Sequence, residues 1–148
     1  MTKSTYARSF RDLFVYQEAR QLSQAIFEVS KRFPKEETYA LTDQIRRSSR
    51  SIGAQIAESW AKRRYEKHFI SKLTDADGEQ QKTQHWIETA VDCTYLSQDE
   101  AAQLLDQCQR IGRLLGSMIS KSNQFCGTPN TLRESTTDYF INPEIGEQ

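Results

Sequence analysis

The chain of 148 residues is long enough for one domain with a single hydrophobic core. Its 20 Lys and Arg residues balance its 20 Asp and Glu residues, and 10% of its residues are aromatic, which excludes a wholly disordered chain. No segment approaches the roughly 18 apolar residues that span a bilayer, and residues 1–12 contain no apolar signal segment, so we expect a cytoplasmic protein without a membrane contact.

Four amphipathic helices are predicted, in chain order, from the spacing of the apolar residues. The first covers about residues 13–33 and ends at Pro34, because proline cannot continue a helix. The second covers about residues 39–60 and the third about residues 65–94. The fourth begins after residue 97 and carries apolar residues at helical spacing as far as about residue 119.

Two helix starts carry capping residues. Thr38 or Thr42 is expected to cap the second helix, because a threonine hydroxyl accepts a hydrogen bond from an unpaired N–H of the first turn. Ser97 and Glu100 have the spacing of a capping box, in which each side chain accepts a hydrogen bond from the other residue's backbone N–H. This pair is the clearest helix start in the chain.

The four helices joined by short connections predict an all-α protein, an antiparallel up-down-up-down four-helix bundle. Residues 13–122 are assigned to the bundle and residues 1–12 to an N-terminal extension. Residues 123–148 are rich in Asn, Thr, Ser, Gly and Pro and are assigned to a polar C-terminal tail.

Glycines inside the predicted helices indicate where helices approach one another. Gly78 weakens the third helix by about 1 kcal/mol relative to Ala, which predicts a close approach by another backbone. Gly112 and Gly116 form a G-x-x-x-G pattern in the fourth helix, where Arg113 excludes a membrane span. This pattern also predicts a close contact between two helices.

The sequence offers no pattern typical of a catalytic or metal site. His68 and His85 are the two histidines, and neither has Glu three residues before it, as a di-iron bundle requires. Residues 75–78 resemble part of a calcium-binding loop. The first and twelfth positions of that loop would be Leu73 and Gln84, which lack the carboxylates that such a loop has there. We therefore expect no enzymatic activity, no metal and no cofactor.

The three cysteines also argue against a metal or redox site. Cys93, Cys108 and Cys126 are odd in number and have no C-x-x-C spacing, which argues against a disulfide framework and a structural zinc site. No spacing brings one of them to a histidine as a catalytic pair would require. Reduced thiols in the core or at incidental positions are expected.

Charge is balanced over the whole chain but not along it. Residues 46–67 contain seven basic residues against two acids, a net charge of +5, whereas residues 74–106 contain eight acids against Lys82, a net charge of −7. Two interpretations of the basic segment stay open, since arginines on a helix either pair with acids and water or contact phosphate. The candidate nucleic-acid-binding residues are Arg46, Arg47, Arg50, Lys62, Arg63 and Arg64.

The second predicted helix is also unusual in having many small side chains beside its apolar stripe, at Ser48, Ser49, Ser51, Gly53 and Ala54. These leave more small surface than one bundle core needs, which predicts that the helix lies at or near a contact between subunits. The expected contact residues are Ser49, Ile52, Gly53, Ile56 and Trp60. The opposite charges of residues 46–67 and 74–106 would suit a ring of head-to-tail contacts.

Over residues 10–122 the chain resembles the bacterial family of 23S rRNA intervening-sequence proteins, also called S23 ribosomal proteins. The most specific part of the resemblance runs from Gln44-Ile45-Arg46-Arg47 to Ile56-Ala57-Glu58. Gln55 and Ser59 depart from the family pattern, which has Asn and Gly at these positions. The other matching residues are Phe10, Leu13, Val15, Tyr16, Gln17, Phe33, Pro34, Leu41, Thr42, Ser51, Ile52, Phe69, Leu73, Ala76 and Gly78.

The resemblance implies a ring-shaped homopentamer of four-helix bundles with no enzymatic activity. The chain is also similar to the accessory variability protein of diversity-generating retroelements, which shares that design and binds RNA and a reverse transcriptase. Two hypotheses for function therefore stay open. One is an RNA- or ribosome-associated binding module; the other is a structural or adaptor ring that binds a protein partner.

Overall fold

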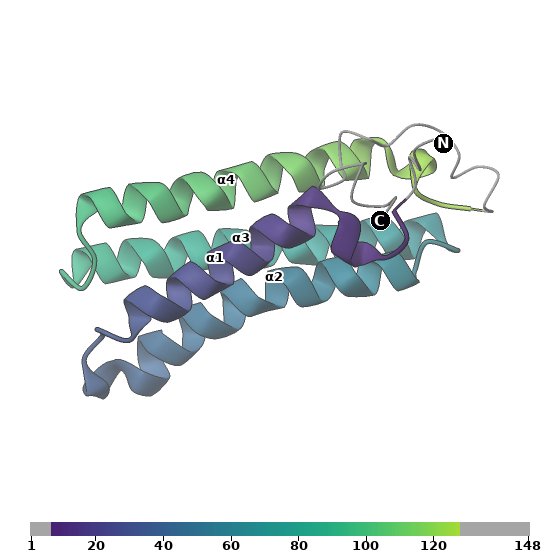
Figure 1. Ribbon diagram of the computed structural model, residues 1–148. Helices are drawn as coiled ribbons and strands as arrows, with labels where there is room; N and C mark the ends of the chain where they lie inside the picture. The colour runs from purple at the N-terminus through teal and green to yellow at the C-terminus, as the bar shows by residue number, and fades with distance from the viewer. Residues whose placement is uncertain (1–6, 128–148) are drawn as a thin grey trace.

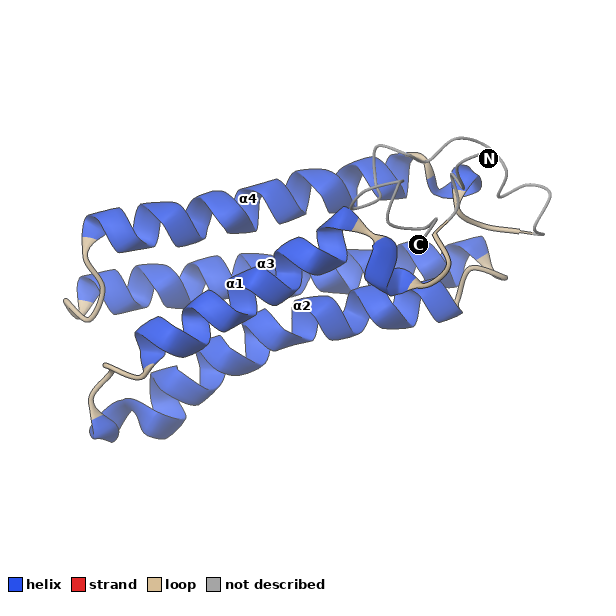
Figure 2. Cartoon of the chain, in the orientation of Figure 1, coloured by secondary structure: helices blue, strands red, loops and turns tan. Residues whose placement is uncertain are grey.

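The computed structural model describes residues 7–127, which form an antiparallel up-down-up-down bundle of four helices, as predicted (Figure 1). Figure 2 shows helices joined by short connections, with no strand among these residues. Each helix packs against two others, with α1 beside α2 and α4 and with α3 beside the same two. The helices are α1 (Phe14–Ser30), α2 (Asp43–Ala61), α3 (Glu66–Asp92) and α4 (Gln98–Ser120).

The predicted capping box begins α4. The Ser97 hydroxyl accepts a hydrogen bond from the Glu100 backbone N–H at 3.1 Å, and the Glu100 carboxylate accepts one from the Ser97 N–H at 3.0 Å. These bonds satisfy donors that the first turn would otherwise leave unpaired. The Ser97 N–H and the nearby Arg32 guanidinium lower the pKa of Glu100.

The predicted threonine cap of α2 is wrong. A π-helical turn, η3 (Thr38–Thr42), runs directly into α2, so the backbone is already helical where the cap was expected. The Thr38 hydroxyl instead donates to the Lys35 carbonyl at 2.6 Å. A helix that continues an earlier turn has its N–H groups satisfied by that turn and needs no side-chain cap.

The core is formed by one apolar stripe from each helix, at the positions that the helical spacing predicted. Leu22 of α1, Ile52 of α2, Phe69 of α3 and Ile111 of α4 are all fully buried. No helix among residues 7–127 is long and apolar enough to cross a membrane. The burial of these four residues shows that the helices pack their apolar stripes against each other and leave their polar faces outward.

The chain after α4 folds back onto the end of the bundle. Phe125 is only 1% exposed; its ring centroid lies 5.9 Å from that of Phe69 and 6.4 Å from that of Trp60. A short 3₁₀ turn, η4 (Ser122–Gln124), brings it there. The start of the predicted tail is thus packed on the bundle, and the remainder of the tail lies outside the described residues.

The glycines only partly mark close contacts. The prediction for Gly78 is wrong, because no atom lies within 4 Å of where its side chain would begin. Gly116 has the same open surroundings. At Gly112, however, a Cβ atom would lie 2.9 Å from the Gln80 side-chain nitrogen on α3, so one glycine of the G-x-x-x-G pattern does admit a neighbouring helix.

Candidate nucleic-acid interface

The six basic residues predicted to bind nucleic acid form two groups. Arg46, Arg47 and Arg50 lie in the first half of α2, whereas the sequence Lys62-Arg63-Arg64 forms the turn between α2 and α3. Lys62 follows Arg50 by twelve positions, which is about 18 Å along a helix. The fold therefore does not gather the six residues into one cluster.

The first group is held against α1 by an aromatic ring. The guanidinium carbon of Arg46 lies 4.8 Å from the Phe27 ring centroid, and that of Arg50 lies 5.5 Å from it. The Arg46 Nε also donates to the Ser30 hydroxyl at 2.7 Å. Arg47 is exposed on a different side of α2. The contacts with Phe27 leave most of the N–H donors of Arg46 and Arg50 open to a ligand.

The second group is positioned by backbone contacts at the end of the bundle. The Arg63 Nε donates to the Trp60 carbonyl at 3.0 Å, and its guanidinium carbon lies 3.8 Å from the Trp60 ring centroid. The Gly127 N–H donates to the Arg63 carbonyl at 3.2 Å, so the chain after α4 meets this turn. Burial lowers the pKa of Arg63. Arg64 is exposed beside it.

The six residues share the lack of an acidic partner among the described residues. Within residues 7–127, none of the six forms an ion pair with a carboxylate, although several other basic side chains do. The pairs between elements are Arg32 with Glu100, Arg110 with Glu18 and Lys72 with Glu58, and further pairs lie within one element or turn, among them Arg8 with Asp12, Lys31 with Glu28 and Lys82 with Glu79. The positive charge of the predicted segment is therefore uncompensated by the described part of its own chain.

Sequence reasoning missed the contribution of α1 to this surface. Tyr16, Arg20 and Phe27 lie along the side of α1 that faces α2, and Lys31 follows one turn later. The signal was present as a second helical stripe, displaced by one residue from the buried stripe of α1. Counting charge along the chain could not reveal it, because the stripe belongs to a different helix from the arginines.

The residues predicted to contact another subunit are divided between the core and the surface. Ser49, Ile52 and Ile56 each have 0% exposure inside the bundle of one chain, so packing within that chain accounts for them. Gly53 and Trp60 are half-buried. A subunit contact on α2 stays a prediction, and only these two of the five residues are placed to take part in it.

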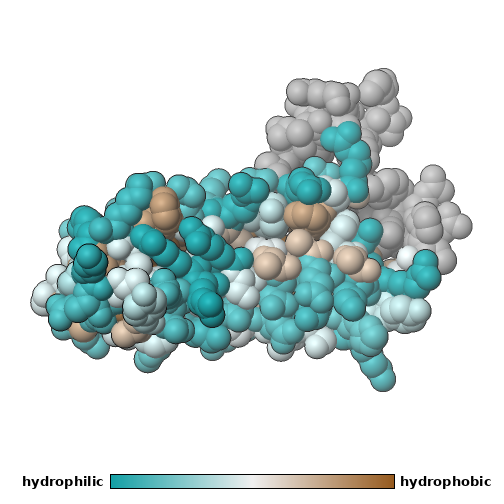
Figure 3. Space-filling model, turned by 90° about the horizontal axis from the view of Figure 1, so that it is seen from below, coloured by the Kyte–Doolittle hydropathy of each residue, from teal (hydrophilic) through white to brown (hydrophobic). Residues whose placement is uncertain are grey.

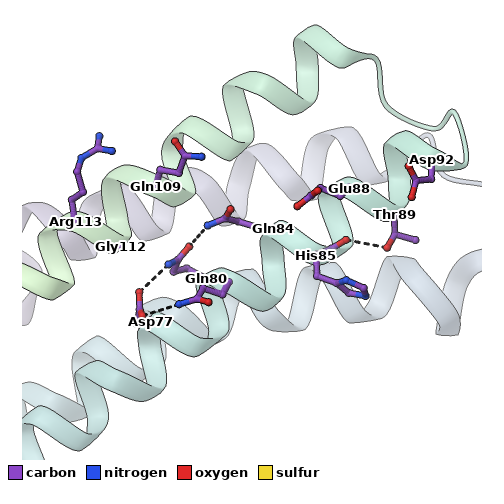
Figure 4. A pocket seen from close by; sticks show the side chains of 11 residues that line it. Asp77, Gln80, Gln84, His85, Glu88, Thr89, Asp92, Gln109, Gly112 and Arg113 are labelled. Carbon is purple, nitrogen blue, oxygen red and sulfur yellow. Dashed lines mark hydrogen bonds between the residues drawn. The ribbon is translucent and has the colours of Figure 1, made fainter.

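A second, polar surface lies between α3 and α4. Figure 4 shows an open groove lined by acids and amides, and its volume is about 800 Å³. The buried Gln80 donates to Asp77 at 2.9 Å and accepts from Gln84 at 2.7 Å. Glu88 lies further along the groove. In the part of the chain that the structure describes, no group of three or more His, Cys, Asp or Glu residues is placed to hold a metal ion.

The fold and this surface define an all-α bundle protein with one basic and one acidic face. The chain belongs to the 23S rRNA-intervening sequence protein family, whose sequence profile matches residues 11–117. A crystal structure of a protein of unknown function from the S23 ribosomal protein family of Bacteroides thetaiotaomicron is 27% identical; the match covers 71% of this chain and 97% of that one, with a TM-score of 0.64. No curated protein matches the chain.

Proposed function

We propose that this chain is a non-enzymatic RNA-binding module that contacts phosphate groups through Arg46, Arg47 and Arg50. Lys62, Arg63 and Arg64 form a second contact at the end of the bundle. The observation that carries this proposal is the lack of an acidic partner for any of the six within residues 7–127, while Arg32, Lys72 and Arg110 elsewhere on the bundle are paired. A polyanion would supply the missing counter-charge.

The positions of the arginines suit this role because they are already ordered. Stacking on Phe27 and Trp60 removes part of the side-chain entropy that a long, free arginine would lose on binding. Cation–aromatic contacts of this kind contribute about 0.5–1 kcal/mol each at exposed sites. They hold the guanidinium groups without satisfying their N–H donors.

Salt dependence of RNA binding tests the proposal. A structured RNA should bind at about 50 mM salt, and its affinity should fall steeply as salt is raised, because each phosphate contact releases counterions. Reversing the two exposed arginines, Arg47→Glu with Arg64→Glu, should reduce the slope of log affinity against log salt by about 1.5. The control variant reverses two charges on the other side of the bundle, Lys82→Glu with Arg113→Glu.

Two results would contradict the proposal. One is undetectable binding at about 50 mM salt, where phosphate contacts are strongest. The other is a slope that falls equally in the control variant, which would show that net charge rather than the α2 surface governs affinity. Both variants change the net charge by the same amount, so they are directly comparable.

We propose, as a second function, an adaptor ring built from copies of this chain, most simply a homopentamer. The basic face lies on α1 and α2, whereas the acidic groove lies between α3 and α4, on the opposite side of the bundle. Two different complementary faces are what a head-to-tail ring requires. Light scattering at the 17.2 kDa mass of one chain would refute the ring. Partners captured from a lysate that survive nuclease treatment would favour the adaptor over the RNA-binding module.

A further inference from the structure

A shallow groove runs along the seam between α1 and α2. Its volume is about 350 Å³, and Ala19, Gly53 and Ala57 contribute small side chains to it. Tyr16 and Arg20 line it from the α1 side. Figure 3 views the bundle from the side on which α2 lies and shows apolar patches set among hydrophilic side chains. The groove is therefore a partly apolar strip within a polar surface.

Cations and aromatic rings alternate along this seam. The guanidinium carbon of Arg20 lies 6.0 Å from the Tyr16 ring centroid. The Phe27 ring has three cations within 6 Å of its centroid, since the Lys31 ammonium lies at 4.7 Å in addition to Arg46 and Arg50. A groove with positive charge along its edges and aromatic rings in its walls is typical of surfaces that bind single-stranded nucleic acid.

Gly53 keeps the groove open beside Tyr16. A Cβ atom at this position would lie 3.6 Å from the Tyr16 ring, which is an ordinary contact distance, so alanine fits there. A larger side chain would extend from that point into the groove. Ala54 and Ala57 are similarly short and leave the strip between Arg50 and the end of α2 uncovered.

We propose that the α1–α2 seam binds single-stranded RNA, with a base stacking on Tyr16 in the groove and with phosphates contacting Arg20 and the two arginines held by Phe27, Arg46 and Arg50. The inference rests on the proposed RNA-binding function and adds the strandedness of the ligand and the residues of α1. Aromatic rings and guanidinium planes stack on bases that are not already stacked in a duplex. In a duplex the bases are stacked on one another, so only the phosphates are available to contact this surface.

Charge favours RNA over an apolar peptide as the occupant. Of the described residues that line the groove, two are arginines and none is acidic. Arg20 and Arg50 form no ion pair with a carboxylate among residues 7–127, so a polyanion entering the groove displaces no existing partner. The groove extends about 10 Å along α2 from Arg50 to Ala57, and Arg46 lies one helical turn before Arg50.

The test compares a labelled oligouridylate of about twelve nucleotides with an RNA duplex of the same length, by fluorescence anisotropy on the full chain. Phe27→Ala removes the ring that holds Arg46 and Arg50 beside the groove but removes no charge, so we expect single-strand affinity to fall about tenfold with an unchanged salt slope. Gly53→Leu should fill the groove and weaken single-strand binding likewise. Gly116→Leu on α4 is the matched control and should leave binding unchanged.

Each outcome decides between the two proposals. Duplex binding as tight as single-strand binding, with no effect of Phe27→Ala, would overturn this inference but leave RNA binding standing. Loss of binding to both RNAs would overturn both. If Gly53→Leu changes the mass in light scattering but not the RNA affinity, the groove is a subunit contact and the inference is wrong. Far-ultraviolet circular dichroism of each variant separates these results from unfolding, and Gly53→Leu carries the test if Phe27→Ala unfolds.

Discussion

Three glycines on the faces of α3 and α4 offer a sharp test of the packing between these helices. Gly78, Gly112 and Gly116 are each replaced by alanine. In a helix interior alanine is favoured over glycine by about 0.8–1 kcal/mol. Gly78 and Gly116 have nothing within 4 Å of the added Cβ, so both variants should gain that free energy of unfolding.

At Gly112 the same gain is opposed by a collision. The added Cβ would lie 2.9 Å from the Gln80 side-chain nitrogen, closer than real Cβ contacts allow. Gln80 is only 4% exposed, and its amide is held by hydrogen bonds with Asp77 and Gln84. Moving it costs about 1 kcal/mol for a lost hydrogen bond and about 1 kcal/mol or more for overpacking. We expect Gly112→Ala to lower the free energy of unfolding by about 1 kcal/mol.

Urea denaturation followed by circular dichroism measures all three variants. The difference between Gly116→Ala and Gly112→Ala should be about 2 kcal/mol, which at this chain length is roughly 4–8 °C in Tm. Adding Gln80→Ala to Gly112→Ala removes the obstructing amide, so the two changes together should cost less than their sum. If Gly112→Ala is as stabilising as Gly116→Ala, α3 and α4 are not in contact at this position.

Three further predictions address the ends of the helices and the thiols. Phe125→Ala should lower the free energy of unfolding by about 3 kcal/mol, because it empties the space between two aromatic rings; a loss below about 1 kcal/mol would show that this segment is not packed on the bundle. Ser97→Ala should lower the free energy of unfolding by about 1 kcal/mol in urea denaturation. An unchanged urea midpoint would show that the capping box does not stabilise the protein. With a disulfide reagent at mildly alkaline pH, Cys93 should react fast, whereas Cys108 and Cys126 should react slowly until urea is added. Burial raises the pKa of Cys108 to about 12 and that of Cys126 to about 11, so three fast thiols would contradict the packing described.

The sequence predicted the bundle well because its apolar residues recur at helical spacing over each whole helix. Ile52 and Phe69, for example, lie in the core as this spacing requires. The capping box at Ser97 was equally readable, because its hydrogen bonds join residues close together in the sequence. Both features depend only on residues within a single helix and its first turn.

Features that depend on two helices were predicted poorly. Gly78 and Gly112 look alike in the sequence, yet only Gly112 faces a neighbouring side chain, because contact depends on how the helices are rotated. Likewise, the six basic residues lie in one segment of the sequence but form two separate groups in space, one on α2 and one in the turn after it. Phe27 joins one of these groups from α1, and no charge count along the chain could include it.

The placement of the ion pairs has a consequence for experiments on this bundle. Arg32 and Arg110 each connect α1 or its end to α4, and Lys72 connects α2 to α3, whereas none of the pairs within residues 7–127 joins α1 to α2. The ion pairs between helices and the proposed binding therefore use different charged residues. Arg20 and Arg47 can be exchanged one by one without breaking an ion pair or hydrogen bond between helices, whereas exchanging Arg46 also removes its hydrogen bond to Ser30, so loss of binding in the first two variants can be interpreted separately from loss of fold.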